Sequence, residues 1–216
     1  MYNKKTYAVF GLGRYGTAVA KTLVEGGMEV LAIDADQRKV NEAATFIPIC
    51  KCADITDREV VERLGISEID TVIIAMASNL ESSVMAVTLC KEVGVKTVIA
   101  KCANPMHQKI LLRVGADEVV FPENESGTRL AKNMLSSGFI DMLSLSNDVS
   151  IVEIDVKDEW VDKNLIELNL RKKYAFNVIA IRENGKVNVD IDPTAPLKKD
   201  MMLIVIAKTA KLAKIK

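Results

Sequence analysis

The chain has 216 residues and carries 29 Lys and Arg against 29 Asp and Glu, so its formal net charge is zero. That balance argues against nucleic acid as the main ligand. No apolar run approaches the ~20 residues that a membrane span needs, and no signal-peptide core follows residues 1–5. We therefore expect a cytoplasmic protein that reaches any membrane through a partner, with one good domain or one domain and a smaller companion.

The first distinctive feature of the chain is a glycine-rich turn. Its glycines have the spacing G-x-G-x-x-G, at Gly11, Gly13 and Gly16. In this spacing the first glycine makes the turn, the second lets the backbone approach a pyrophosphate, and the third lets a helix pack on a strand. A strand-like run precedes the turn, and a second strand ends at Asp34, close to the ~20-residue offset of the acid that takes ribose hydroxyls. The sequence thus predicts a nucleotide with its phosphate at the helix N-terminus.

Strand-like and helix-like stretches then alternate up to residue 122. The predicted strands are residues 6–10, 30–33, 46–50, 71–75, 97–101 and 118–121. Among the helices between them, the one that ends near Leu64 has Thr56 and Glu59 spaced as a capping box. The alternation predicts an α/β domain over residues 1–122, with a Rossmann-like doubly wound parallel sheet and helices on both faces.

The pattern changes after residue 122. Residues 123–145 have a helical pattern with a break at 136–138, which predicts a helix and linker over 123–146. Short strands dominate from residue 150, and Asn184-Gly185 is a hairpin signal. We therefore expect a small α+β domain over 147–216, small enough that pairing with a neighbour is plausible.

The four cysteines lack the C-x-x-C spacing of metal and redox sites. They are Cys50, Cys52, Cys90 and Cys102, and three of them lie in or beside apolar strand or helix patterns. This placement favours buried, reduced thiols.

Two functions fit a nucleotide-binding domain: an NAD-dependent oxidoreductase, and a sensor that transmits nucleotide binding to another protein. An oxidoreductase needs a general acid or base. The only histidine is His107, no Tyr-x-x-x-Lys pair follows the fourth strand, and the C-terminal region has no obvious cluster of catalytic groups. We favour the sensor, which is not an enzyme, and keep the oxidoreductase as the alternative.

A series of short motifs, in order along the chain, carries a family resemblance. The motifs are residues 11–16, 53–56, 74–79, 114–117, 121–123 and 162–180. In this combination the chain resembles the cytosolic regulatory subunits of Trk/Ktr-type potassium uptake systems, also called RCK or KTN proteins. The resemblance implies an N-terminal RCK domain, a crossover helix and a C-terminal RCK domain. It also implies dimers and an octameric ring, of one kind of subunit or two, beneath an integral-membrane potassium-translocating subunit.

The resemblance further implies that the glycine loop binds ATP or ADP, with NAD(H) as the alternative. The residues it places at the nucleotide are Gly11, Gly13, Arg14, Tyr15, Gly16, Asp34, Ala53, Asp54, Ala75, Met76, Asn79, Lys101 and Glu123. Asp34 would accept from both ribose hydroxyls, and its charge would oppose a 2′-phosphate, which disfavours NADP. Arg14 would read a terminal phosphate, or is a solvated loop charge.

Three of these residues have two interpretations each. Asp54 would accept from the adenine amino group, or it only begins a helix. Lys101 would reach a phosphate, or it caps the sheet edge. Glu123 would help to hold Mg²⁺ or Ca²⁺, or it stabilises a helix dipole. At Phe121 the chain departs from the commoner histidine of the family but keeps the following proline and glutamate.

The resemblance also points to a second ligand, cyclic di-AMP, bound between two copies of the C-terminal domain. The matching positions are Arg171, Phe176, Asn177 and Pro193. Arg171 would face phosphate and Asn177 adenine, whereas Phe176 is larger than the residue usual there and could fill the pocket. The other interpretation is a plain dimer interface.

Overall fold

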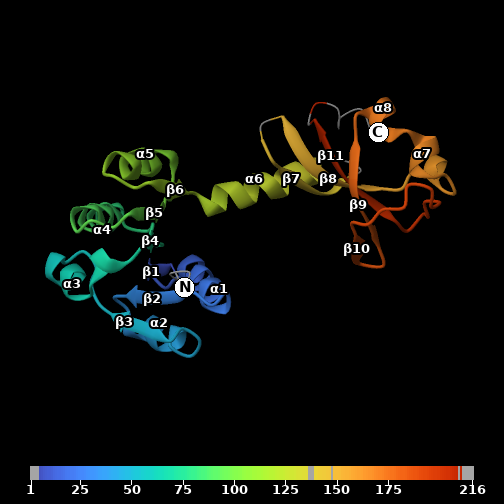
Figure 1. The fold of residues 1–216 in the computed structure, drawn as a ribbon. Coiled ribbons are helices and arrows are strands. Elements are labelled where there is room, and N and C mark those ends of the chain that lie inside the picture. The colour runs from blue at the N-terminus through green and yellow to red at the C-terminus, as the bar shows by residue number, and fades with distance from the viewer. Residues whose placement is uncertain (1–4, 136–138, 147, 209, 211–216) are drawn as a thin grey trace. The chain divides into compact units, whose positions relative to one another are not determined.

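The computed structural model describes residues 5–135, 139–146, 148–208 and 210, and divides into two compact units, Met1–Pro122 and Glu123–Lys216 (Figure 1). Each unit has its own sheet. Among the described residues, no helix is both long enough and apolar enough to cross a bilayer.

The first unit contains a parallel sheet of six strands in the order β3-β2-β1-β4-β5-β6. The strands are β1 (Thr6–Phe10), β2 (Glu29–Asp34), β3 (Ile49–Cys52), β4 (Thr71–Ile74), β5 (Thr97–Lys101) and β6 (Glu118–Val120). The helices are α1 (Arg14–Glu25), α2 (Gln37–Ala43), α3 (Arg58–Arg63), α4 (Leu80–Glu92) and α5 (Pro105–Arg113), with a 3₁₀ turn at Ile66–Glu68. The predicted doubly wound fold is confirmed. The chain adds β2 and β3 on one side of β1 and β4 to β6 on the other. Sheets of this kind bind ligands at the point where the side changes, beside β1.

Helices cover both faces of this sheet because its strands are apolar on both sides. In β1, Ala8 and Phe10 belong to a core shared with α3, α4 and α5, whereas Val9 belongs to a second core shared with α1 and α2. Successive residues of a strand point to opposite faces, so a continuous apolar run supplies both cores.

Two local predictions in this unit were wrong. The third strand begins at Ile49, because Phe46 and Ile47 still donate their backbone N–H groups to the Ala43 carbonyl at the end of α2. Helix α3 is capped by Asp57, whose side chain accepts from the Glu59 N–H at 2.8 Å.

The four cysteines occupy unlike environments, and none forms a disulfide. Cys90 and Cys102 are buried as expected, and burial raises the pKa of the Cys90 thiol to about 12. Cys50 is half-buried, and Cys52 is exposed on the edge strand β3, so the expectation of burial was wrong for Cys52.

The second unit contains an antiparallel sheet of five strands in the order β10-β9-β11-β8-β7. The strands are β7 (Phe139–Ser144), β8 (Val149–Asp155), β9 (Asn177–Glu183), β10 (Lys186–Asn188) and β11 (Met202–Lys208). The helices are α6 (Pro122–Leu135), α7 (Leu165–Leu168) and α8 (Leu170–Tyr174), with a 3₁₀ turn at Asp158–Trp160. The predicted hairpin is confirmed: Asn184 and Gly185 have φ of 51° and 75° and join the paired residues Glu183 and Lys186.

The helical pattern predicted over residues 123–145 holds only in its first part. Residues 139–144 form β7, which pairs antiparallel with the apolar strand β8, so the predicted helix is wrong there. Pairing with a neighbouring strand has overridden a short helical pattern. The break expected at 136–138 lies outside the described residues.

Candidate functional site

A cavity of about 300 Å³ opens at the carboxyl edge of the first sheet. Its lining comes from the ends of the first strands, the loops after β1 to β4 and the first turns of α2 and α4: Gly11, Ile33, Asp34, Ala35, Lys39, Ala53, Asp54, Ile55, Thr56, Met76, Ser78, Asn79 and Ser82. Six predicted residues are among them: Gly11, Asp34, Ala53, Asp54, Met76 and Asn79. Because β1 lies between β2 and β4, the cavity occupies the point of the sheet where nucleotides bind in this class of fold.

The glycine loop owes its course to close backbone contacts. Gly11 has φ +94° and donates its N–H to the Ile33 carbonyl at 2.8 Å. A Cβ on Gly16 would lie 1.9 Å from the Gly11 carbonyl oxygen and 2.9 Å from the Ala75 Cβ. A side chain is therefore impossible at Gly16 without moving the loop.

Gly13 differs from the other two glycines because it faces open space. It precedes the first residue of α1, and a Cβ there would meet nothing within 4 Å. The unpaired N–H groups of a helix's first turn attract anions, and a residue without a side chain lets a phosphate come close.

Asp34 ties the end of β2 to the glycine loop. Its Oδ2 accepts from the Leu12 N–H at 2.7 Å, and its Oδ1 accepts from the Asp36 N–H at 2.8 Å. The side chain is 9% exposed and pairs with Lys39, whose Nζ lies 3.3 Å from Oδ2. Asp34, which the sequence predicts to bind the ribose, therefore also holds the glycine loop in place.

Asp54 and Asn79 both begin turns at the rim of the cavity. The backbone N–H and the hydroxyl of Thr56 hold the pKa of the Asp54 carboxyl below its ordinary value, so this side chain is an ionised acceptor at neutral pH. Asn79 caps α4 by accepting from the Ser82 N–H at 3.1 Å. Each therefore has a structural role, and each still lines the cavity.

The remaining predicted residues of the first unit surround the glycine loop and are not part of the cavity lining. Arg14 is exposed at the first position of α1. The Lys101 ammonium, at the end of β5, lies 5.5 Å from the centre of the Tyr15 ring. Ala75 donates its N–H to the Phe10 carbonyl at 2.7 Å and limits the space at Gly16.

Glu123 is exposed in the first turn of α6, in the second unit. Among the described residues, no group of three or more His, Cys, Asp and Glu side chains is arranged to hold a metal ion. The metal role of Glu123 stays a prediction.

Sequence reasoning did not place Lys39, Thr56, Ser78 and Ser82 at the site, although they line the cavity with polar groups. A signal for Lys39 was present in its position. Lys39 lies in the first turn of α2, where the helix dipole disfavours a positive charge. A lysine at such a position, five residues after Asp34, could have suggested an ion pair with that carboxylate.

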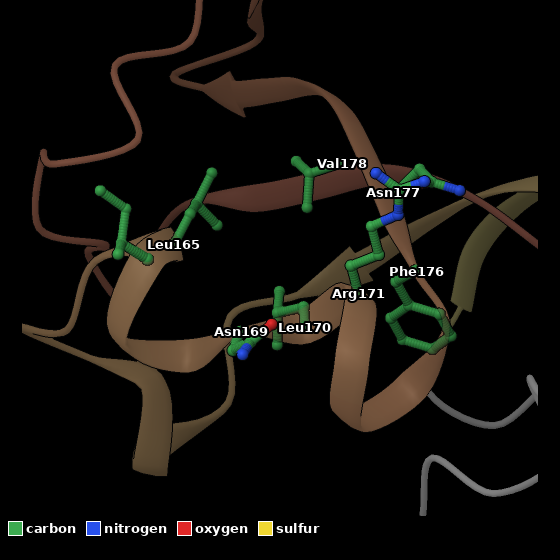
Figure 2. A pocket seen from close by; sticks show the side chains of 8 residues that line it. Leu165, Asn169, Leu170, Arg171, Phe176, Asn177 and Val178 are labelled. Carbon is green, nitrogen blue, oxygen red and sulfur yellow. The ribbon is translucent and has the colours of Figure 1, made fainter.

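A second cavity, of about 460 Å³, lies in the second unit (Figure 2). It is lined by Leu165, Ile166, Asn169, Leu170, Arg171, Phe176, Asn177 and Val178. Figure 2 shows the Arg171 side chain extending from α8 towards Asn177 at the start of β9. The structure thus brings together three of the four predicted residues, whereas Pro193 lies in the loop between β10 and β11 and is not part of the lining.

The ring of Phe176 belongs mainly to the core of this unit. The residue is 1% exposed, and its ring stacks on Tyr174 with centres 5.7 Å apart. Tyr174 in turn packs on Trp160 at 6.0 Å. Phe176 therefore forms a wall of the cavity, and its size does not fill the space beside Arg171.

Comparison with known proteins matches both units to sequence families. Residues 7–122 match the TrkA-N domain, and residues 149–216 match the TrkA-C domain. Ktr system potassium uptake protein C of Bacillus subtilis (strain 168) is 37% identical over 98% of this chain and 96% of its own length. Ktr system potassium uptake protein A of Vibrio alginolyticus is 32% identical over 97% of this chain and 95% of its own.

Solved structures agree on the fold. A structure of the GsuK channel has a TM-score of 0.69 at 15% identity and covers 98% of this chain, which spans 39% of the GsuK chain. At this identity the likeness concerns the fold alone. The sequence matches show that the chain belongs to the TrkA family, with one TrkA-N and one TrkA-C domain.

Proposed function

We propose that the chain is the nucleotide-sensing regulatory subunit of a potassium uptake system. The observation that carries the proposal is the cavity beside Gly11 and Asp34, at the point of the sheet where nucleotides bind. The Ktr potassium uptake proteins of similar length support the physiological role.

In the proposed binding mode an adenine nucleotide crosses the carboxyl edge of the sheet. Its phosphates lie over Gly13 at the N-terminus of α1, its ribose reaches Asp34, and its adenine lies near Asp54. Arg14 is exposed beside the phosphates, where its guanidinium can pair with a terminal phosphate. ATP and ADP are the proposed ligands.

NAD(H) is the alternative ligand for the same cavity. One GsuK structure of the same fold is of the channel bound to NAD, with a TM-score of 0.65 and 15% identity. The phosphate and ribose positions are common to both ligands, so the same loop serves either. An oxidoreductase is less well supported, because His107 is buried in α5 and is not part of the cavity lining.

Two further ligands belong to the proposal. Glu123 is an exposed carboxylate and supplies an oxygen ligand of the kind that Mg²⁺ and Ca²⁺ prefer. Cyclic di-AMP occupies the second cavity, with Arg171 at a phosphate and Asn177 at an adenine edge. If that cavity binds no nucleotide, the same residues form a dimer interface.

The proposed mechanism is a shift between two arrangements of a ring. Subunits pair into dimers and an octameric ring, alone or with a related subunit, at the inner face of the membrane. A triphosphate held by Arg14 favours one arrangement and a diphosphate the other, in proportion to the difference in their affinities. The ring then changes the activity of its integral-membrane potassium-translocating partner.

Calorimetric titration of nucleotide-stripped protein tests the proposal. ATP, ADP, NADH and cyclic di-AMP are added in turn, with and without Mg²⁺, and light scattering gives the mass of the assembly. Adenine-nucleotide binding to a multi-subunit assembly without turnover is the expected result. Binding of NADH alone, to a dimer that oxidises it with a small substrate, would contradict the regulatory function.

A further inference from the structure

The charge of Asp34 is already matched inside the nucleotide cavity. Lys39 lines this cavity, and its ammonium lies 3.3 Å from Oδ2 and 3.5 Å from Oδ1 of Asp34. Two backbone N–H groups, of Leu12 and Asp36, also donate to this carboxylate. The ribose end of the cavity is therefore close to neutral, although the sequence shows an acid there.

The two partners differ in their freedom to move. The Asp34 side chain is 9% exposed and fixed by the backbone on each oxygen, whereas the Lys39 side chain is 45% exposed. Lysine carries its charge on a flexible four-carbon stem with three rotatable donors. Lys39 can therefore turn towards a ligand while Asp34 stays in place.

We propose that Lys39 determines which ribose the cavity accepts, and that it admits adenine nucleotides carrying a 2′-phosphate as well as those with a free 2′-hydroxyl. The inference rests on the proposed nucleotide site and deepens it. With a free ribose, the hydroxyls approach Asp34 beside Lys39. With a 2′-phosphate, the ammonium turns from the carboxylate to the phosphate and offsets the repulsion from Asp34.

The neighbouring Arg38 provides a matched control. It lies on the same helix, carries the same charge and pairs with Asp36 at 3.1 Å, but it is not part of the cavity lining. Replacement of Lys39 or Arg38 by methionine removes one charge and keeps most of the apolar stem. A general effect of net charge changes both variants, whereas a direct contact changes only the first.

The test is the ratio of affinities for two ligands that share an adenosine diphosphate. ADP-ribose and 2′-phospho-ADP-ribose are titrated calorimetrically into the wild-type protein and into Lys39→Met and Arg38→Met. We expect the wild type to bind the two ligands with affinities within about tenfold of each other. In Lys39→Met the affinity for 2′-phospho-ADP-ribose should fall by about tenfold relative to that for ADP-ribose, as expected for the loss of one charge-assisted hydrogen bond. Arg38→Met keeps the wild-type ratio.

Two results would overturn the inference while leaving the nucleotide site intact. In one, ADP-ribose binds to the wild type but its 2′-phosphate binds about a hundredfold more weakly or not at all. In the other, Lys39→Met weakens the binding of both ligands equally, which would mean that Lys39 only supports the fold of the loop. If neither ligand nor ADP binds to the wild type, the nucleotide site itself is wrong and the inference fails with it.

Discussion

The cavity beside the glycine loop and the cavity beside Arg171 are built in different ways. The first lies at the ends of parallel strands and is shaped by the main chain, with Gly11 and Gly16 pressed against neighbouring backbone. The second is shaped by side chains of two short helices and the start of β9. A site made by the main chain leaves a spacing of glycines in the sequence, whereas a site made by side chains leaves no such pattern. Substitutions should therefore affect the two cavities differently.

The largest expected effect is that of Gly16→Ala. The new Cβ would lie 1.9 Å from the Gly11 carbonyl oxygen, so α1 must move away from the sheet. We expect a loss of about 3 kcal/mol or more in the free energy of unfolding, together with loss of ADP binding. Chemical denaturation and calorimetry measure the two.

The matched control for this substitution is Gly13→Ala, with a Cβ that meets nothing within 4 Å and a φ of −73° that any residue adopts. It should keep the free energy of unfolding within about 0.5 kcal/mol of the wild-type value. It should weaken ADP binding, because the new methyl group occupies the space through which the phosphates approach the backbone. Equal stability losses for both variants would contradict the close-contact argument.

The next largest effect is expected for Asp34→Asn. Both carboxylate oxygens accept backbone N–H groups, and the amide of asparagine turns an NH₂ towards one of them. Leaving that donor unpaired costs about 1–3 kcal/mol. The difference between the melting temperatures of wild type and variant, both without ligand, measures the loss. Unchanged stability would show that the carboxylate does not hold the loop.

In the second cavity, Arg171→Ala should weaken cyclic di-AMP binding and leave the fold unchanged. Arg171 is exposed, and its loss affects no core contact. We expect the affinity to fall by about tenfold to a hundredfold, as for loss of one or two charge-assisted hydrogen bonds. Lys172→Ala, a neighbouring exposed charge outside the lining, is the control. If wild-type protein shows no cyclic di-AMP binding, the cavity belongs to a dimer interface.

A smaller effect is expected for Arg14→Ala in the first unit. Arg14 is exposed, so stability should stay within about 0.5 kcal/mol. ATP affinity should fall by about tenfold with ADP affinity retained, because the guanidinium contacts only the γ-phosphate, which ADP lacks. Equal losses for both nucleotides in calorimetry would exclude this role.

The smallest effect is a pH dependence that belongs to the first unit. Burial lowers the pKa of His107, and its Nδ1 accepts from the Ala103 N–H at 3.3 Å, so the folded chain holds the ring neutral. Below the ordinary pKa of 6.5 the unfolded chain takes up a proton that the folded chain resists, so stability should fall as the pH drops from 7 to 5.

The slope from one such histidine is at most about 1.4 kcal/mol per pH unit. Denaturation at several pH values measures it, and His107→Gln should flatten the curve over this range. An equally steep curve in the variant would assign the effect to other groups.

The sequence predicted most of what the main chain determines. The six parallel strands and the Asn184-Gly185 hairpin follow from periodicity and turn chemistry. The positions of Gly11 and Asp34 follow from spacing. These features depend on residues that are near in sequence, or on a regular alternation of strands and helices.

The rest depends on contacts that no local pattern encodes. Strand β7 forms because β8 offers an apolar partner, although its own residues read as helical. The Asp34–Lys39 pair depends on how far a side chain reaches from the first turn of α2. The second cavity brings Arg171 beside Asn177 through the packing of α8 on the sheet, and only the family resemblance suggested that these residues belong together.

The central claim is that an adenine nucleotide binds across the glycine loop, and diffraction from crystals grown with ADP tests it most directly. The account predicts phosphates over Gly13 at the N-terminus of α1, and ribose hydroxyls at Asp34. Density for ADP in the second cavity alone, with the first cavity empty, would contradict it.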